Sequence, residues 1–131
     1  MIVDTSALIA ILRQEPEALE FRRILAASEQ SRMSVANFVE AGDGARDPIV
    51  SRGLDDLIRL AEIEIEPVTL EQGRLAREAY RDFGRGSGHA AKLNFGDRFA
   101  YALAKESGEA LLYKGNLFGA TDVSSARGAQ Q

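Results

Sequence analysis

Three acidic side chains in this chain stand where they could hold a divalent cation together. Asp4 follows the first short apolar segment, and Asp97 stands near the start of a strong helical pattern. Glu40 lies within another helical pattern. Ligands of open parallel sheets bind at the carboxyl ends of the strands, so acids at such junctions converge on one edge. Because like charges raise one another's pKa, a bound cation stabilises the cluster, activates water and offsets charge on a phosphoryl group.

Each acid also has a purely structural explanation. Asp4 can cap a helix that begins at residue 5, and Glu40 can lie on a solvated helix face. Asp97 stands three residues after Asn94, which is the spacing of a capping box, and its charge suits the first turn of a helix. Asp122, after the last apolar segment, fits a turn or a cap. The metal site is favoured by the combination of the acids and by none of them alone.

The composition excludes several other kinds of site. The 131 residues include no cysteine and one histidine, which excludes disulfides, thiolate metal sites and multi-histidine zinc sites. Oxygen ligands suit Mg²⁺ or Mn²⁺. The chain opens without a basic, apolar leader and contains no apolar run near the roughly 20 residues of a membrane helix. We therefore expect a cytoplasmic protein with no membrane contact.

The net charge of −4 is unevenly distributed along the chain. Residues 1–80 carry fifteen acids and nine lysines or arginines, whereas residues 81–131 carry five acids and seven lysines or arginines. The C-terminal part is therefore the more plausible phosphate-binding part. Within it, a basic and glycine-rich run at 81–92 is either a solvated loop or a guide for a phosphate backbone.

Short apolar segments alternate with amphipathic helical patterns. Strands are expected at 1–4, 32–34, 63–68, 110–113 and 121–123, and helices at 5–12, 15–27, 35–42, 54–61, 70–83 and 94–107. This alternation predicts an α/β domain with a mainly parallel sheet and helices on both faces. We expect one domain over residues 1–123 and a flexible tail over residues 124–131. Phe95, Phe99 and Tyr101 fit core positions of the last helix.

Four segments of the chain resemble the PIN-domain ribonuclease toxins of bacterial type II toxin–antitoxin pairs, the VapC group. They read IVDTSAL at 2–8, SVANFVEAG at 34–42, LNFGDRFAYALA at 93–104 and LLYKGN at 111–116. Their order and spacing extend the resemblance over essentially the whole chain. It implies a PIN-like three-layer α/β/α fold and metal-dependent cleavage of RNA within the chain.

The resemblance also implies roles for individual residues and partners. Asp4 and Asp97 would be the principal ligands of Mg2+ (or Mn2+), with Glu40 completing the catalytic acids. Ser6, more than Thr5, would support the metal by hydrogen bonding. The implied partners are an RNA substrate, a VapB-type antitoxin that blocks the pocket and a second copy of the chain. Operator DNA would be reached only through the antitoxin.

Two residues depart from the family pattern. Leu117 stands where the family usually has an acid after Gly-Asn, so one carboxylate of the usual four is missing. Asp122 is a candidate substitute. The alternative function is therefore a catalytically weakened PIN domain that acts mainly by binding its antitoxin. Arg98 follows Asp97, where relatives often carry a small residue, and it can neutralise acids, contact phosphate or point away.

The candidate RNA-contacting residues are basic side chains near Asp97. They are Arg85, Lys92 and Arg98.

We predict that a Leu117→Asp variant binds Mg²⁺ or Mn²⁺ more tightly than the unmodified protein, because it restores a fourth carboxylate to the cluster. Calorimetric titration with each metal measures the change. An unchanged affinity would contradict the view that Leu117 weakens the site.

Overall fold

A four-stranded parallel sheet forms the centre of the molecule, in the computed structural model that describes residues 1–43, 46–84, 86–88 and 91–128. The strands follow the order β3-β2-β1-β4. They are β1 (Ile2–Val3), β2 (Ser31–Ser34), β3 (Ile63–Glu66) and β4 (Leu111–Leu112). The pairing is parallel throughout, with Ile2 beside Arg32 on one side and Leu111 on the other. The parallel α/β fold predicted from the sequence is confirmed.

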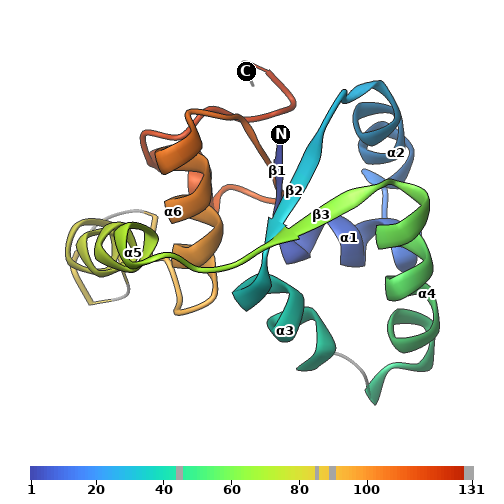
Figure 1. The fold of residues 1–131 in the computed structure, drawn as a ribbon, viewed down its shortest axis with the longest axis horizontal. Coiled ribbons are helices and arrows are strands. Elements are labelled where there is room, and N and C mark those ends of the chain that lie inside the picture. The colour runs from blue at the N-terminus through green and yellow to red at the C-terminus, as the bar shows by residue number, and fades with distance from the viewer. Residues whose placement is uncertain (44–45, 85, 89–90, 129–131) are drawn as a thin grey trace.

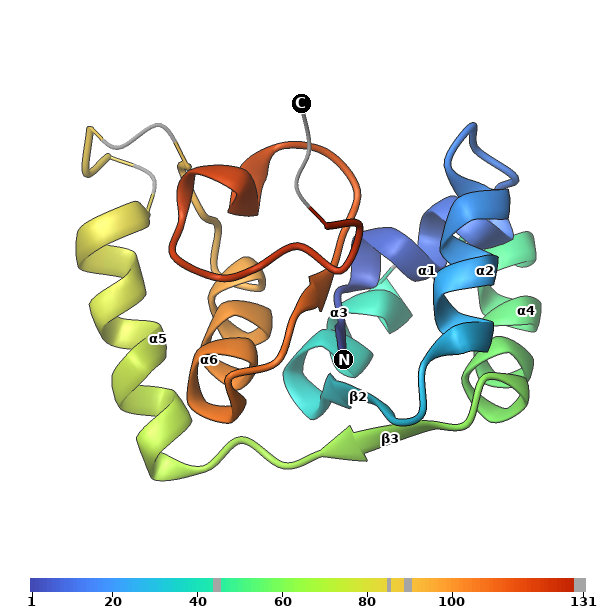
Figure 2. The ribbon, with the colours of Figure 1, turned by 90° about the horizontal axis from the view of Figure 1, so that it is seen from above.

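Helices cover both faces of this sheet (Figure 1). One group consists of α1 (Thr5–Leu12), α2 (Ala18–Ala27) and α4 (Pro48–Leu60), and the opposite face carries α5 (Leu70–Phe83) and α6 (Asp97–Ser107). The view from above shows α5 and α6 side by side at one end and α2 and α4 at the other (Figure 2). The helix α3 (Val35–Asp43) follows β2 directly.

Two hydrophobic cores hold these layers together, one on each face of the sheet. Val3 packs in the core with α1, α2 and α4, whereas its neighbour Ile2 packs in the core with α5 and α6. Leu112 and Leu111 divide between the two cores in the same way. Successive strand residues point to opposite faces, so two-residue strands buried on both sides must be apolar at every position.

Most helix boundaries lie close to the predicted ones, and the differences have local causes. The chain makes a turn after α1, where Gln14 has a positive φ of 53°, so α2 begins at Ala18 and not at residue 15. The helix expected at 54–61 begins earlier, at Pro48. Proline suits the first position of a helix because that position needs no N–H donor.

The strand expected at residues 121–123 was wrong. A short 3-10 helix, η2 (Leu117–Ala120), precedes these residues, and they form bends and no strand. Asp122 is held there by Tyr101 and Lys105 of α6. The chain returns to the sheet only afterwards, where the N–H of Leu111 donates to Ser124 at 2.8 Å.

Residues 124–128, which the sequence placed in a tail, contact the body of the molecule. Ser125 forms an isolated parallel bridge with Leu111. The guanidinium of Arg127 donates to Glu20 of α2 at 2.6 Å and lies 5.4 Å from the centre of the Phe21 ring.

In the described ranges, no helix is long and apolar enough to span a membrane.

Candidate active site

Asp4 is a buried carboxylate at the junction between β1 and α1. It is 4% exposed, and β1 ends at the residue before it. Its Oδ2 accepts hydrogen bonds from the backbone N–H of Ser6 at 3.1 Å and from the Ser6 hydroxyl at 2.5 Å. Asp4 is therefore the N-cap of α1, as its structural explanation required, and it also lies at the carboxyl end of the sheet.

The hydroxyl of Ser6 forms hydrogen bonds to two different segments, whereas the hydroxyl of Thr5 bonds to a third. The backbone N–H of Lys114, just after β4, donates to the Ser6 hydroxyl at 3.0 Å. The Thr5 hydroxyl donates to the carbonyl of Asn37 at 3.0 Å and so ties α1 to α3. Of the two hydroxyls considered from the sequence, Ser6 is the one that contacts the Asp4 carboxylate.

Asp97 and Asn94 form the capping box expected from their spacing. The Asn94 side chain accepts from the backbone N–H of Asp97 at 2.9 Å, and Asp97 accepts from the backbone N–H of Asn94 at 2.8 Å. The helix was expected to begin at residue 94. Residues 94–96 instead form the cap that these reciprocal bonds hold, and α6 begins at Asp97. The reciprocal bonds also fix the Asp97 carboxylate, which is 7% exposed.

Glu40 is positioned by two residues that the sequence analysis did not assign to the site. The buried amide of Asn37 donates to Glu40 Oε1 at 3.3 Å and to the carbonyl of Gly96 at 3.0 Å. A Cβ atom at Gly96 would lie 1.8 Å from Glu40 Oε2. Asn37 could have been found from its place one helical turn before Glu40. The closeness of Gly96 to Glu40 had no signal in the sequence.

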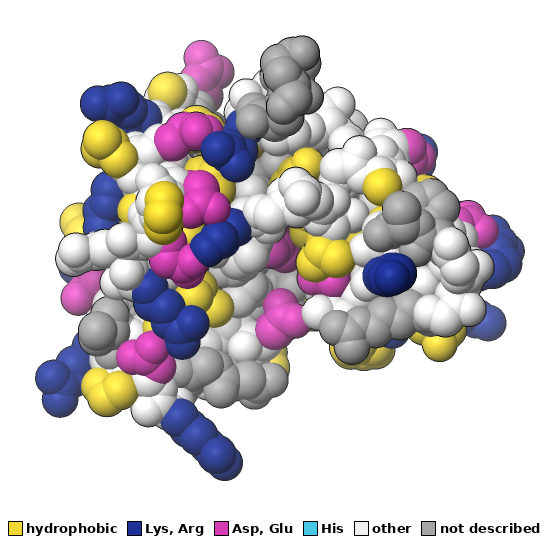
Figure 3. All heavy atoms as spheres, turned by 180° about the vertical axis from the view of Figure 1, so that it is seen from behind, with side chains coloured by type: hydrophobic (Ala, Val, Ile, Leu, Met, Phe, Trp, Pro, Cys, Tyr) yellow, Lys and Arg dark blue, Asp and Glu magenta, His cyan; other side chains and the backbone are white. Residues whose placement is uncertain are grey.

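The charges of these three acids act on one another. Burial raises the pKa of Asp4 from 3.8 to about 6, while the hydrogen bonds from Ser6 lower it and the negative charges of Asp97 and Glu40 raise it further. The structure therefore brings together all three acids that the resemblance placed in the site. Figure 3 shows acidic side chains near the middle of one face, where the surface is notched.

The residues fit a divalent cation with oxygen ligands. Oδ1 of Asp4 is buried and has no hydrogen-bond partner within the part of the chain that the structure describes. In the same residues, no three acidic or imidazole side chains form a ready-made metal site. Mg²⁺ keeps several of its waters and uses one or two protein carboxylates, so Asp4 and Asp97 are sufficient as direct ligands.

The other candidates lie apart from this cluster. Asp122 accepts from the Tyr101 hydroxyl at 2.7 Å and pairs with Lys105, so it does not replace the missing acid. Burial raises the pKa of Asp122, but its bonds to Lys105 and Tyr101 outweigh this and leave the pKa lowered. Leu117 is 39% exposed at the start of η2.

The structure describes two of the three basic candidates. Lys92 is exposed, with a positive φ of 52°. Arg98 stacks on two aromatic rings, Tyr80 and Phe95. Arg85 lies outside the described residues.

The chain is similar to known proteins over almost its whole length. A family model described as PIN domain matches residues 1–123. Ribonuclease VapC28 of Mycobacterium tuberculosis is 57% identical over 129 residues, which cover 96% of this chain and 97% of the relative. Ribonuclease VapC42 of the same organism is 48% identical over 129 residues, covering 96% of this chain and 98% of the relative.

Two solved structures share the fold. A toxin–antitoxin complex from Klebsiella pneumoniae contains a chain with a TM-score of 0.71 and 17% identity, covering 95% of this chain and 96% of that one. VapC20 of M. tuberculosis, a sarcin–ricin-loop-cleaving toxin, has a TM-score of 0.67 and 18% identity, covering 93% and 95%. These identities are low, so the two structures show the fold alone.

We predict that Asp4→Asn stabilises the metal-free protein at neutral pH. The folded state raises the pKa of Asp4 from 3.8 to about 6 through burial, so the folded state holds this proton more tightly than the unfolded state. Stability is therefore lost as the pH rises from about 4 to about 6, by up to about 3 kcal/mol, and stays lower above that window. Asparagine removes this loss and can still accept hydrogen bonds from Ser6.

Urea unfolding of both proteins, with chelator, at pH 4 and pH 7.5 measures the effect. The stability difference should be larger at pH 7.5 than at pH 4. Added Mg²⁺ should stabilise the unmodified protein more than the variant. The prediction would be contradicted if the variant and the unmodified protein had the same free energy of unfolding at pH 4 and again at pH 7.5.

We also predict that Gly96→Ala weakens Mg²⁺ binding by about 10- to 100-fold, the usual effect of disturbing a group that orients a metal ligand. The added methyl would displace the Glu40 carboxylate. Fold stability should change little, because Gly96 has helical φ and ψ of −67° and −39°. Gly73→Ala is the matched control, since a Cβ there meets nothing within 4 Å. Calorimetric affinities that are equal for the two variants would refute this role of Gly96.

Proposed function

The chain belongs to the PIN-domain family, in its VapC ribonuclease group, and we propose that it is a divalent-metal-dependent endoribonuclease. One observation carries the proposal. Asp4 is a buried carboxylate with a raised pKa, caused first by burial, and it has an unpartnered oxygen among the described residues beside the charges of Asp97 and Glu40. Such a group is costly for the fold, and a cation-dependent site explains its presence.

Each acid has its own role in the proposed reaction. Asp4 and Asp97 would hold Mg²⁺ or Mn²⁺ at the carboxyl end of the sheet. The bound cation would lower the pKa of a water and offset the negative charge that develops on the phosphoryl group. Ser6 keeps Oδ2 of Asp4 in a hydrogen bond, so that Oδ1 would be the oxygen free to bind the cation.

Glu40 would be the acid that accepts a proton. Hydrolysis joins a water oxygen to the phosphorus while one ester P–O bond breaks. The attacking water loses a proton, and the leaving ester oxygen gains one from solvent water to become a hydroxyl. The Glu40 carboxylate is half-buried, and Asn37 holds one of its oxygens at 3.3 Å. That bond leaves its second oxygen, Oε2, next to Gly96, to orient the water and take the proton.

The proposed partners follow from the family and from the charge of the pocket. The chain would act as the toxin of a type II pair and bind a VapB-type antitoxin. A basic antitoxin side chain suits the acidic pocket, since arginine binds carboxylates with two parallel hydrogen bonds. Operator DNA would be contacted only through the antitoxin, and the toxin would form a homodimer.

Several finer assignments belong to the same proposal. Residues 1–123 would be the catalytic domain, and the cytoplasm its location. Lys92, Arg98 and Arg85 would contact RNA phosphates. No observation favours the binding-only alternative that Leu117 suggested.

The test is cleavage of RNA by the purified chain without antitoxin, with Mn²⁺ and with chelator. We expect metal-dependent cleavage, and a loss of at least about 100-fold in Asp4→Ala and in Asp97→Ala, because each removes a direct ligand. Asp56→Ala is the matched control, since Asp56 is an exposed acid on α4 that pairs with Arg59. Cleavage that survives chelator, or both active-site substitutions, would rule out this mechanism.

A further inference from the structure

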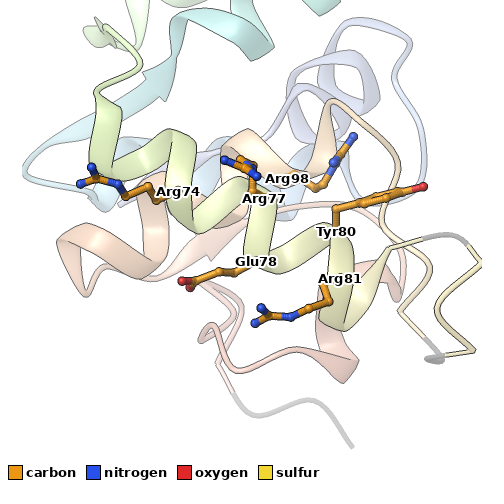
Figure 4. A pocket seen from close by; sticks show the side chains of 6 residues that line it. All are labelled: Arg74, Arg77, Glu78, Tyr80, Arg81 and Arg98. Carbon is orange, nitrogen blue, oxygen red and sulfur yellow. The ribbon is translucent and has the colours of Figure 1, made fainter.

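A hollow of about 480 Å³ lies along the outer side of α5. Its lining is dominated by guanidinium groups and consists of Arg74, Arg77, Glu78, Tyr80, Arg81 and Arg98. Arg98 comes from α6 and the other five from α5. In Figure 4, Arg74 and Arg77 extend to the side of α5 on which Arg98 lies, whereas Glu78 and Arg81 extend to the other side.

The three arginines on that side are largely free of carboxylates. Arg77 and Arg98 form no ion pair with any residue that the structure describes. Arg74 pairs only with Glu71, at 3.7 Å between two exposed side chains. An exposed pair at this distance contributes little and is easily exchanged for another anion. The positive charge of this side is therefore available to a ligand.

Arg98 connects the hollow to the acid cluster. Its guanidinium lies 4.4 Å from the centre of the Tyr80 ring and 5.0 Å from that of Phe95, and its Nε donates to the Asn94 carbonyl at 3.3 Å. The N–H of the same Asn94 is bonded to Asp97. The side chain of Arg98 is thus held in place at a fixed position relative to a proposed metal ligand.

Phe95 does not occupy the core position expected from the sequence. It is 69% exposed, and its ring packs edge-on against Phe99 at 5.1 Å. Phe95 also lines a second hollow, of about 340 Å³, together with Glu40. The stack of Tyr80, Arg98 and Phe95 therefore joins the arginine-lined hollow to the hollow that Glu40 lines.

We propose that Arg74, Arg77 and Arg98 form a phosphate track that holds single-stranded RNA beside the acid cluster, with Tyr80 as the residue that positions Arg98. This inference rests on the proposed endoribonuclease function. An acidic pocket on a chain of net charge −4 repels RNA, so productive binding needs cationic groups near the cut site. Arg74 and Arg77 lie one helical turn apart, which suits the repeating charges of a backbone, and the guanidinium fork matches phosphate oxygens.

RNA is favoured over an acidic protein segment because the track leads to the proposed cleavage site. A protein that merely covers the surface requires no such connection. Phosphate contacts of this kind fix the position of a nucleic acid without reading its sequence. The track should accordingly raise affinity for RNAs of any sequence.

The first experiment measures RNA binding in an Asp4→Ala background, so that the RNA is not cut. A labelled single-stranded RNA is titrated with the Arg74→Gln/Arg77→Gln protein and with an Arg22→Gln/Arg23→Gln control. The control removes the same charge from α2, at the other end of the molecule (Figure 1). The track variant should bind on the order of tenfold more weakly near 0.1 M salt, and the slope of log K against log salt should fall by about 1.4. Equal affinities and slopes for the two variants would overturn the proposal.

The second experiment tests the role of Tyr80. Tyr80→Leu should weaken RNA binding because Arg98 loses its aromatic support. Tyr80→Phe should bind RNA as the unsubstituted protein does, because the ring remains. Thermal unfolding of each variant confirms that these exposed substitutions leave the fold intact. Equal RNA affinity of the leucine and phenylalanine variants would overturn the positioning role.

The track and the proposed function fail in different ways. If the protein cleaves RNA with Mn²⁺ but the arginine variants bind RNA as tightly as the control does, the track is overturned and the proposed function stands. If the protein binds RNA through these arginines but does not cleave it, the track stands and the proposed function is overturned. Weakened binding of an acidic peptide, with RNA binding unchanged, would assign the arginines to a protein partner and overturn the proposal.

Discussion

The burial of the Asp4 carboxylate beside two further acids is the constraint on which this site depends. Asp4 is almost fully buried, and the charges of Asp97 and Glu40 add to the burial that raises its pKa. The fold supplies each acid with a hydrogen-bond donor. Ser6 donates to Asp4 and the backbone of Asn94 donates to Asp97. Asn37 donates to Glu40. Neighbouring cations bind elsewhere, Lys114 to Glu15 and Arg98 to aromatic rings. A pocket built in this way is negative, which is why we propose a divalent cation as its ligand.

The capping roles of Asp4 and Asp97 are compatible with the proposed chemistry because both have one origin. A helix that follows a parallel strand begins at the carboxyl end of that strand, and its first N–H groups need an acceptor. Asp4 meets that need for α1, and Asp97 meets it with Asn94 for α6. The donors that cap the helix also hold the carboxylate in one orientation. An acid placed there for capping is therefore already fixed and aimed at the edge where ligands bind.

The sequence predicted what depends on local patterns and failed on contacts between distant segments. Short apolar runs identified the four strands, and the spacing of Asn94 and Asp97 predicted their reciprocal hydrogen bonds. The link from Asn37 to Gly96 joins residues 59 positions apart, so no local pattern could reveal it. Phe95 has helical-core spacing, but the chain caps α6 at that point and leaves its ring exposed. Asp122 was misjudged because its partners, Tyr101 and Lys105, lie on a helix that the chain reaches again only after η2.

The same constraint bears on the missing fourth acid. The backbone of Lys114 bonds to Ser6, and Leu117 follows three residues later at the start of η2. A carboxylate added in this segment would bring another negative charge toward a cluster in which the pKa of Asp4 is already raised to about 6, mainly by burial. It would attract a cation more strongly, and in the cation-free protein its charge would add to the repulsion on Asp4. By this argument leucine would give a weaker cation site in a more stable fold. The three remaining acids keep their hydrogen-bond donors, so the proposed site would persist without the fourth acid.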